Sequence, residues 1–286
     1  MEKLVGKTVG LIACSDGRDH DSSVVSEVME LFSEMGITSV LASTIYHRGN
    51  TPFSGSSEER ACQLMKFFKD EKIAAIFDIS GGNSANHILP YLDYAVIREN
   101  PKPFLGISDL SVILNAIYAR STVPTFHYQV ANLVGEHALE QRHLFRKLFL
   151  HDSDYATCMT FDYSWLRGKE MTGVLVGGNL RCFLKLAGTL YMPDPTNKIV
   201  FLESLGGRSS LIASLLSQLD QIGYFEHCNG VLLGTFTQMV VEKQEPSIEE
   251  LVFKMTQKYQ LPVAVTNQLG HGDDTHCLPI GTTLSF

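Results

Sequence analysis

A serine stands at a sharp turn, Gly106-Ile107-Ser108-Asp109, between a short apolar run and an amphipathic one. This order is typical of a strand that turns directly into a helix. A serine in that place has its hydroxyl at the carboxyl end of a sheet, beside the free N–H groups of a helix start, which suits a nucleophile. Serine and aspartate are also preferred helix N-caps, so the turn alone leaves both interpretations open.

Two residues in the second half of the chain could activate this serine. A serine hydroxyl needs a base that takes its proton and a third group that orients the base. Glu203 ends an apolar run, and His271 stands between two glycines. Each also has an ordinary explanation, as a glutamate where a strand meets water or as a histidine in a turn. We predict a serine hydrolase in which Ser108, Glu203 and His271 act together.

Paired glycines follow another apolar run, in the segment Ser80-Gly81-Gly82-Asn83-Ser84. Backbone N–H groups of such a turn can approach a ligand closely, which predicts a cradle for an oxyanion or a phosphate. The alternative is an ordinary tight turn that needs a positive φ. The spacing matches neither a dinucleotide fingerprint nor a phosphate-binding lysine loop.

Metal and thiol chemistry are weaker alternatives. One loop gathers four potential metal ligands, His271, Asp273, Asp274 and His276. Their spacing is not one known for zinc and they share a single loop, so we expect no metal. The six cysteines are scattered without a CxxC pair, which indicates reduced thiols. Cys14 or Cys182 could be a thiol nucleophile, although free cysteines are more often small buried residues.

The elements that position these residues alternate between strands and helices. Strand-like runs cover residues 7–13, 38–43, 73–79 and 122–127, and helical runs cover residues 22–35, 58–69 and part of 132–150. This order predicts an α/β fold with a parallel sheet, in which ligands bind at the carboxyl ends of the strands. His127 ends one of these runs and either faces the same cleft or is a structural histidine.

The periodic pattern weakens over residues 151–168, which we interpret as a bridge between two domains. The first domain then covers residues 1–150 and carries the serine, and the second covers residues 169–286 and carries the glutamate and the histidine. In the second domain, a glycine-containing run over residues 173–180 leads into a helix that ends near residue 186. Strand-like runs cover residues 198–203, 230–234 and 262–266, and helical runs cover residues 209–222 and 248–259.

Composition excludes several classes of protein. The chain has 286 residues, of which 44% are hydrophobic and 19% charged, as in a globular protein. Its net charge of −8 disfavours a nucleic-acid partner. No apolar run is long enough for a membrane span, and no signal peptide is recognisable, so we expect a cytoplasmic protein.

Several segments, taken in order, resemble the LD-carboxypeptidases and the related microcin C immunity peptidases over most of the chain. They are Gly81-Gly82-Asn83-Ser84, Leu89-Pro90-Tyr91-Leu92-Asp93-Tyr94, Pro101-Lys102-Pro103-Phe104 leading into Gly106-Ile107-Ser108-Asp109, Gly177-Gly178-Asn179-Leu180, Phe201-Leu202-Glu203, and Gly270-His271-Gly272 with Leu278-Pro279-Ile280-Gly281. Each is weak alone, and their common order makes the resemblance specific.

The resemblance implies a serine peptidase with Ser108 as nucleophile and Glu203 and His271 as its partners. It also implies that the N–H groups of Gly82 and Asp109 form the oxyanion hole. The expected fold is a flavodoxin-like N-terminal domain with a smaller β-rich α+β C-terminal domain. The expected assembly is a homodimer without metal or organic cofactor.

The resemblance further implies the substrate, a muropeptide cleaved at the amide before its C-terminal D-amino acid. The alternatives are an acyl-sulfamoyl or peptidyl-nucleotide amide, as in microcin immunity, and a catalytically silent binding protein. Three positions depart from the family pattern, Ser80, Cys14 and Tyr128. We expect all three near the substrate cleft.

The predicted substrate contacts are Asn83, Ser84, His127 and Arg208. Arg208 and Arg181 are candidates for binding a terminal carboxylate, because a guanidinium can bind both carboxylate oxygens at once. The alternative for each is an ordinary surface arginine.

Overall fold

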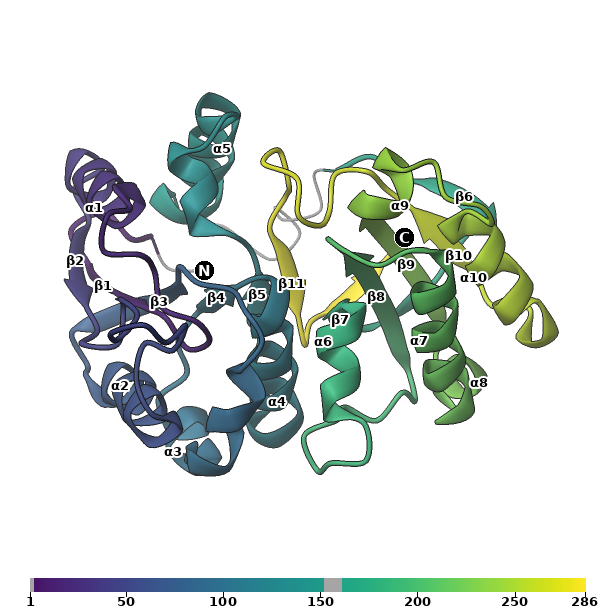
Figure 1. Cartoon of the computed structure of the whole chain (residues 1–286), viewed down its shortest axis with the longest axis horizontal. Helices are drawn as coiled ribbons and strands as arrows, with labels where there is room; N and C mark the ends of the chain where they lie inside the picture. Colours follow the sequence, from purple (N-terminus) through teal and green to yellow (C-terminus); the bar gives the residue numbers. More distant parts are fainter. Residues whose placement is uncertain (1–2, 152–160) are drawn as a thin grey trace.

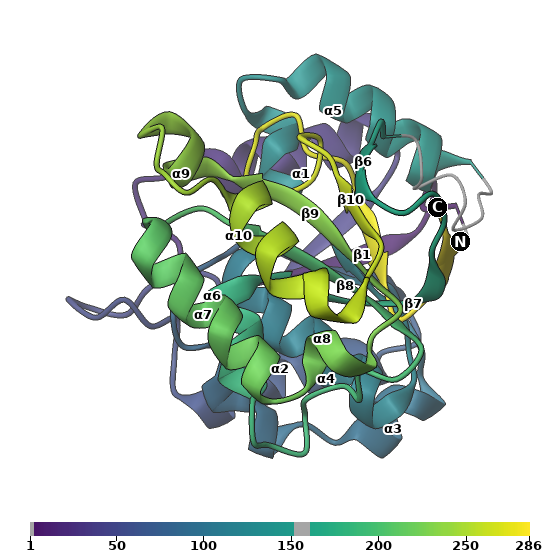
Figure 2. The same ribbon diagram turned by 90° about the vertical axis from the view of Figure 1, so that its right-hand side faces the viewer.

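The computed structural model describes residues 3–151 and 161–286, so the predicted bridge, residues 151–168, lies partly outside the described residues. Two six-stranded sheets with their helices stand next to each other (Figures 1 and 2). No helix in the described ranges has the length and apolar character needed to cross a membrane.

The first sheet has the strand order β11-β5-β4-β3-β1-β2. Its strands are β1 (Thr8–Ile12), β2 (Thr38–Leu41), β3 (Ile73–Asp78), β4 (Phe104–Gly106), β5 (Thr125–His127) and β11 (Leu278–Ile280), and its helices are α1 (Val24–Glu34), α2 (Ser57–Lys69), α3 (Tyr94–Glu99), α4 (Ser111–Ser121) and α5 (Ala138–Phe145). Strands β1 to β5 are parallel. Their order is that of a flavodoxin-like sheet, 2-1-3-4-5, which confirms the predicted fold class.

Local sequence explains these elements. Strand β3 is buried at every position except one, as expected of a parallel strand covered on both faces. Helix α2 begins with a capping box, in which the Ser56 side chain accepts from the Glu59 N–H and the Glu59 side chain accepts from the Ser56 N–H.

The second sheet has the order β12-β7-β8-β9-β10-β6. Its strands are β6 (Ser164–Arg167), β7 (Thr172–Asn179), β8 (Lys198–Ser204), β9 (Gly230–Phe236), β10 (Val263–Val265) and β12 (Thr283–Ser285), and its helices are α6 (Leu180–Phe183), α7 (Ser209–Gln221), α8 (Tyr224–His227), α9 (Thr237–Val241) and α10 (Ile248–Thr256). The four central strands are parallel and the two edge strands antiparallel. Helices and strands are both substantial here, so this half is an α/β unit too.

Two short strands lie where the sequence pattern does not place them. Strand β6 falls within the predicted bridge and pairs with β10 in the second sheet. Strand β11, near the C-terminus, pairs with β5 in the first sheet, with Leu278 opposite His127. Residues of the predicted bridge therefore belong to the second sheet, and residues of the predicted second domain complete the first sheet. The exact domain boundaries stay a prediction.

Helix α4 forms much of the interface between the two sheets. Eight of its eleven residues are buried, including every residue of its first two turns, as in a helix that is covered on most sides. The Asn115 amide donates to the Gly177 carbonyl at 2.7 Å and accepts from the Gly177 N–H at 2.9 Å. The Ser111 hydroxyl accepts from the Asn179 N–H at 2.9 Å. These contacts attach the helix that follows Ser108 to the second sheet.

Gly178 permits this close approach, and its substitution tests the interface. Its φ is +135°, and a Cβ there would lie 2.4 Å from the Ser111 Oγ. Gly178→Ala therefore adds an overpacked contact to a strained backbone, and we expect it to lower the free energy of unfolding by about 2 kcal/mol or more.

Gly188 supplies the control for this substitution. Its φ is +76°, and a Cβ there would meet nothing within 4 Å. Gly188→Ala should lose only about 1 kcal/mol, because it adds backbone strain alone. Urea denaturation measures both variants, and equal losses would contradict the assigned interface.

Candidate active site

Ser108 lies at the turn between β4 and α4, at the carboxyl end of the first sheet. Its φ is +61°, in the left-handed region that residues other than glycine rarely adopt. Ile107 is extended, and a short 3₁₀ turn over Ser108–Leu110 leads into α4. The capping positions belong to Ile107 and Leu110, and neither makes a side-chain cap bond. The strained turn is thus typical of a nucleophile elbow rather than of a helix cap.

Glu203 and His271 are brought together by the second sheet. Glu203 lies on β8 and is fully buried, and His271 lies in the loop between β10 and β11. The Nδ1 of His271 is 2.6 Å from the Oε2 of Glu203. The Nε2 of the same ring is buried and has no hydrogen-bond partner among the described residues. The carboxylate therefore orients the ring and leaves Nε2 for another proton acceptor or donor.

His127 lies behind this pair and not on the surface of a cleft. It is fully buried, with its Nε2 3.7 Å from the Oε1 of Glu203 and its ring edge-on to Phe201. Burial by itself would raise the pKa of Glu203, but the neighbouring imidazoles of His271 and His127 outweigh it and lower that pKa to about 2. Glu203 therefore stays ionised at neutral pH.

The glycine turn lies beside the serine. A Cβ on Gly81 would lie 3.9 Å from the Ser108 Oγ, so the two turns come close together. Gly82 has a φ of +135°, and a Cβ there would lie 2.2 Å from the carboxylate carbon of Asp16. Only glycine fits this position. That its N–H serves an oxyanion hole stays a prediction.

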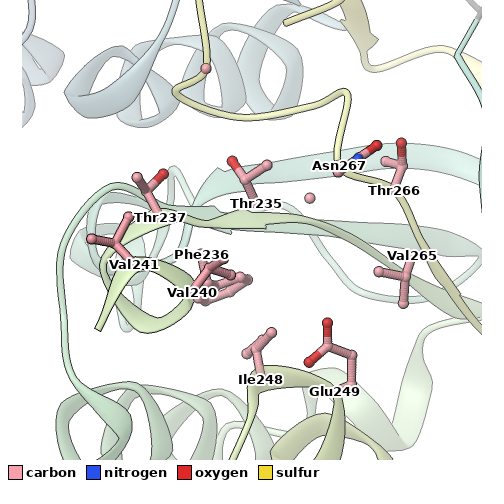
Figure 3. Close-up of a pocket in the computed structure, with 12 residues that line it drawn as sticks. Thr235, Phe236, Thr237, Val240, Val241, Ile248, Glu249, Val265, Thr266 and Asn267 are labelled. Atoms are coloured by element: carbon pink, nitrogen blue, oxygen red, sulfur yellow. The ribbon is translucent and has the colours of Figure 1, made fainter. Parts of the chain in front are cut away.

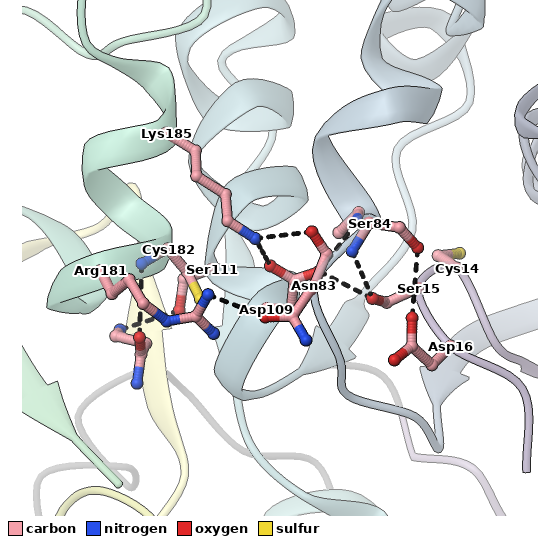
Figure 4. Close-up of polar contacts among 12 residues, drawn as sticks. Cys14, Ser15, Asp16, Asn83, Ser84, Asp109, Ser111, Arg181, Cys182 and Lys185 are labelled. Atoms are coloured by element: carbon pink, nitrogen blue, oxygen red, sulfur yellow. Dashed lines mark hydrogen bonds and ion pairs between the residues drawn. The ribbon is translucent and has the colours of Figure 1, made fainter. Parts of the chain in front are cut away.

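The Asp109 side chain is the centre of a polar network (Figure 4). Its Oδ2 accepts from the Ser15 hydroxyl at 2.7 Å and from the Ala85 N–H at 2.8 Å. Its Oδ1 forms an ion pair with Lys185, which comes from the second half of the chain. Burial favours the neutral acid, but the bonds from Lys185, Ala85 and Ser15 hold the pKa of Asp109 below its ordinary value.

The other predicted substrate contacts differ in how exposed they are and in whether they already have partners within the protein. Ser84 is buried and bonded to the guanidinium of Arg60, which also binds the carbonyls of Cys14 and Ser15. Arg208 is exposed but pairs with Glu242 at 2.7 Å. Asn83 is exposed on the glycine turn. The structure thus leaves Asn83 accessible beside Ser108, buries Ser84 and His127, and pairs Arg208 with a carboxylate.

The two alternative chemistries find little support. Cys14 and Cys182 are fully buried, and burial raises both thiol pKa values, that of Cys182 to about 12. Neither is therefore an activated thiolate. Among residues 3–151 and 161–286, no group of three histidine, cysteine, aspartate or glutamate residues could hold a metal ion.

A cavity of about 300 Å³ opens at the carboxyl ends of β9 and β10 (Figure 3). Its lining is mainly apolar, with Phe236, Val240, Ile248 and Val265, and it reaches Gly272, next to His271. None of the side chains of Ser108, Glu203 and His271 lines it. The cavity thus adjoins the loop that carries His271 without including the reacting groups.

Sequence reasoning missed Lys185, Arg60 and Asn115. Each acts through a partner distant in sequence, 76 residues away for the pair of Lys185 and Asp109. No local motif marks such residues. The one available signal was that Lys185 and Asn115 lie on segments adjoining the recognised turns.

Comparison with known proteins agrees with the geometry. Residues 9–128 match the family model for the LD-carboxypeptidase N-terminal domain, and residues 172–286 match that for the LD-carboxypeptidase C-terminal domain. A probable murein peptide carboxypeptidase of Bacillus subtilis is 26% identical, over 96% of this chain and 87% of the relative. The microcin C7 self-immunity protein MccF of Escherichia coli is 26% identical, over 83% of this chain and 78% of the relative.

Solved structures show the same fold. The crystal structure of an MccF-like protein from Bacillus anthracis superimposes with a TM-score of 0.86 at 24% identity, covering 99% of this chain and 94% of that one.

Removing Lys185 tests the network around Asp109. Lys185→Met leaves a fully buried carboxylate without its cation, and we expect a loss of about 3 kcal/mol in the free energy of unfolding. Adding Asp109→Asn should recover part of this loss, because no buried charge then remains. Lys258→Met is the control, since it removes an exposed ion pair with Asp220 and should lower the stability much less than Lys185→Met does. Similar losses for the two lysines would contradict this account.

Glu203 should make stability depend on pH in a defined window. Its folded pKa of about 2 lies below the ordinary 4.5, so the unfolded chain binds more protons between these values. Its stabilisation is complete above about pH 4.5 and is lost as the pH falls towards 2. The stability difference between the wild type and Glu203→Gln, measured by urea denaturation, should shrink over that window. A constant difference would argue against an ionised Glu203.

Proposed function

This chain belongs to the LD-carboxypeptidase family of serine peptidases, and from that premise we propose that it hydrolyses the amide before the C-terminal D-amino acid of a muropeptide. We further propose that it acts in the cytoplasm, as its sequence predicts, and as a homodimer, as the family resemblance implies. The similarity to a murein peptide carboxypeptidase supports the substrate class.

In the proposed first step, the Ser108 Oγ attacks the amide carbonyl while the Nε2 of His271 takes its proton. The carbonyl oxygen becomes an oxyanion, held by the N–H groups of Gly82 and Asp109. Glu203 keeps the other ring nitrogen of His271 protonated and stabilises the imidazolium. The C–N bond then breaks, and His271 gives its proton to the departing amine of the D-amino acid.

In the second step, water attacks the acyl ester on Ser108. His271 accepts a proton from this water and returns it to the serine oxygen as the C–O bond breaks. The products are the shortened peptide acid and the free D-amino acid. All groups needed for both steps come from the chain itself.

The observation that carries this proposal is the buried pair of His271 and Glu203. The His271 ring is oriented at 2.6 Å by a carboxylate, and its other nitrogen has no partner in the part of the chain that the structure describes, which is the arrangement required of a general base. The half-buried Ser108 on a strained turn supplies a matching nucleophile.

The decisive assay is release of D-alanine from a tetrapeptide stem that ends in this residue. We expect turnover by the wild type and a loss of about 10⁴-fold or more in Ser108→Ala and His271→Ala, because the members of a triad act as a unit. Thermal unfolding serves as the control for folding. Undiminished release by Ser108→Ala would rule out the proposed nucleophile.

A second candidate substrate is an acyl-sulfamoyl or peptidyl-nucleotide amide. The similarity to the microcin C7 self-immunity protein favours it. Comparing kcat/KM for a D-alanine tetrapeptide and for a glutamyl sulfamoyl nucleoside separates the two. Labelling of Ser108 by a fluorophosphonate, lost in His271→Ala, tests the nucleophile independently of either substrate.

A further inference from the structure

A carboxypeptidase must recognise a carboxylate close to the bond that it breaks, and the following inference rests on the proposed function. Three cationic side chains reach the glycine turn next to Ser108. They are Arg60, Arg181 and Lys185. They differ in how much of their hydrogen-bonding capacity is already used.

Arg60 is not accessible to a substrate. It is 1% exposed, and its Nη1 already contacts the carbonyls of Cys14, Ser15 and Ser84 and the Ser84 hydroxyl. A guanidinium enclosed in this way ties loops together. It has no open face for a ligand.

The Lys185 ammonium also already has partners within the protein. Its ammonium forms the ion pair with Asp109 and donates to the Asn83 carbonyl at 2.9 Å. Its side chain is only 19% exposed. Withdrawing this charge would leave Asp109 buried and unpaired, so Lys185 is a structural cation.

Arg181 is the cation that remains open. It is exposed, and its Nη1 donates to the Asn83 Oδ1 at 2.8 Å. Among the described residues, no carboxylate lies within 4 Å of its guanidinium. A guanidinium has five N–H donors in a planar fork, so the bond to Asn83 fixes the group and leaves most donors free.

Arg181 also reaches the glycine turn that lies beside Ser108. It stands four residues before Lys185, and in Figure 4 both side chains extend from the same helical segment towards Asn83 and Asp109. Asn83 follows Gly81, the residue whose Cβ would lie 3.9 Å from the Ser108 Oγ. The amide before a C-terminal residue is separated from the carboxylate by a single Cα. The group that binds the carboxylate must therefore lie near the nucleophile, and the glycine turn that Arg181 contacts lies beside Ser108.

We propose that Arg181 binds the terminal carboxylate of the substrate, with Asn83 holding the guanidinium in place. The alternative, Arg208, is neutralised by Glu242. Arg181 thereby makes the enzyme specific for the last residue of the peptide, since an internal amide offers no carboxylate at that position.

The test uses two tetrapeptides that differ only at the C-terminus, one with D-alanine and one with D-alanine amide. For the free acid, Arg181→Met should raise KM by about 10- to 100-fold, the range expected for losing a charged hydrogen-bonded contact. Arg181→Lys should retain part of the binding, because it keeps the charge but not the fork. For the amide, which offers no carboxylate, Arg181→Met should change KM little.

The matched control is Arg120→Met, which removes an exposed arginine at the opposite end of α4 from Ser108. A raised KM in Arg208→Met with a normal Arg181→Met would overturn the assignment. An equal loss for the acid and the amide in Arg181→Met would also overturn it.

Binding of the same two peptides to the Ser108→Ala protein, measured by calorimetry, separates this inference from the proposed function. Preferential binding of the acid that disappears with Arg181→Met supports the role of Arg181 even if turnover is absent. Equal binding of acid and amide contradicts it even if D-alanine is released. A wild type that binds the acid but never cleaves it contradicts the proposed reaction alone.

Discussion

The buried carboxylate of Asp109 holds together the segments from which the site is built. A charge without solvent needs compensation, and it comes here from three separate places, the Ser15 hydroxyl, the Ala85 N–H and the Lys185 ammonium. These contacts fix the loop after β1, the residue that follows the glycine turn and the 3₁₀ helix after α6 (Leu184–Leu186) relative to the residue that follows Ser108. The backbone N–H of Asp109 is also the predicted oxyanion donor. The stability of the turn and its predicted chemistry therefore depend on the same residue.

The two sheets must also be held in a fixed position relative to each other, because the serine follows a strand of the first sheet and its predicted partners lie on or after strands of the second. Helix α4 meets this requirement by being mostly buried and by bonding through Asn115 to the backbone of Gly177. Strand β11 adds a second connection, because it follows the loop of His271 in sequence yet pairs with β5 of the first sheet. Rigid placement of this kind is what positions a base against a nucleophile.

Sequence alone predicts the parts whose signal is local. The apolar runs that become β3 and β8, and the helical period of α2, agree closely with the structure. The pairing of Glu203 with His271 agrees as well. Strand β6 was missed because it is a partly exposed edge strand without an apolar run. The sequence does not indicate which sheet β11 joins, because the apolar run Leu278-Pro279-Ile280 would suit a strand in either sheet. Lys185 was missed because its partner lies in the other half of the chain.

The side chains at the three positions that depart from the family pattern are buried. Ser80 is 2% exposed, Cys14 is fully buried and Tyr128 is 1% exposed, so their side chains are not open to a substrate, and the expectation that they lie near the cleft stays a prediction. Asp78 accepts from the Ser80 hydroxyl at 2.6 Å and from the Cys14 N–H at 2.7 Å, which joins the starts of two loops beneath the site. Substitutions at such positions alter a binding site by moving the loops above them. On the glycine turn the exposed groups are Asn83 and the arginine that it holds, which is where our proposal places direct recognition of the substrate.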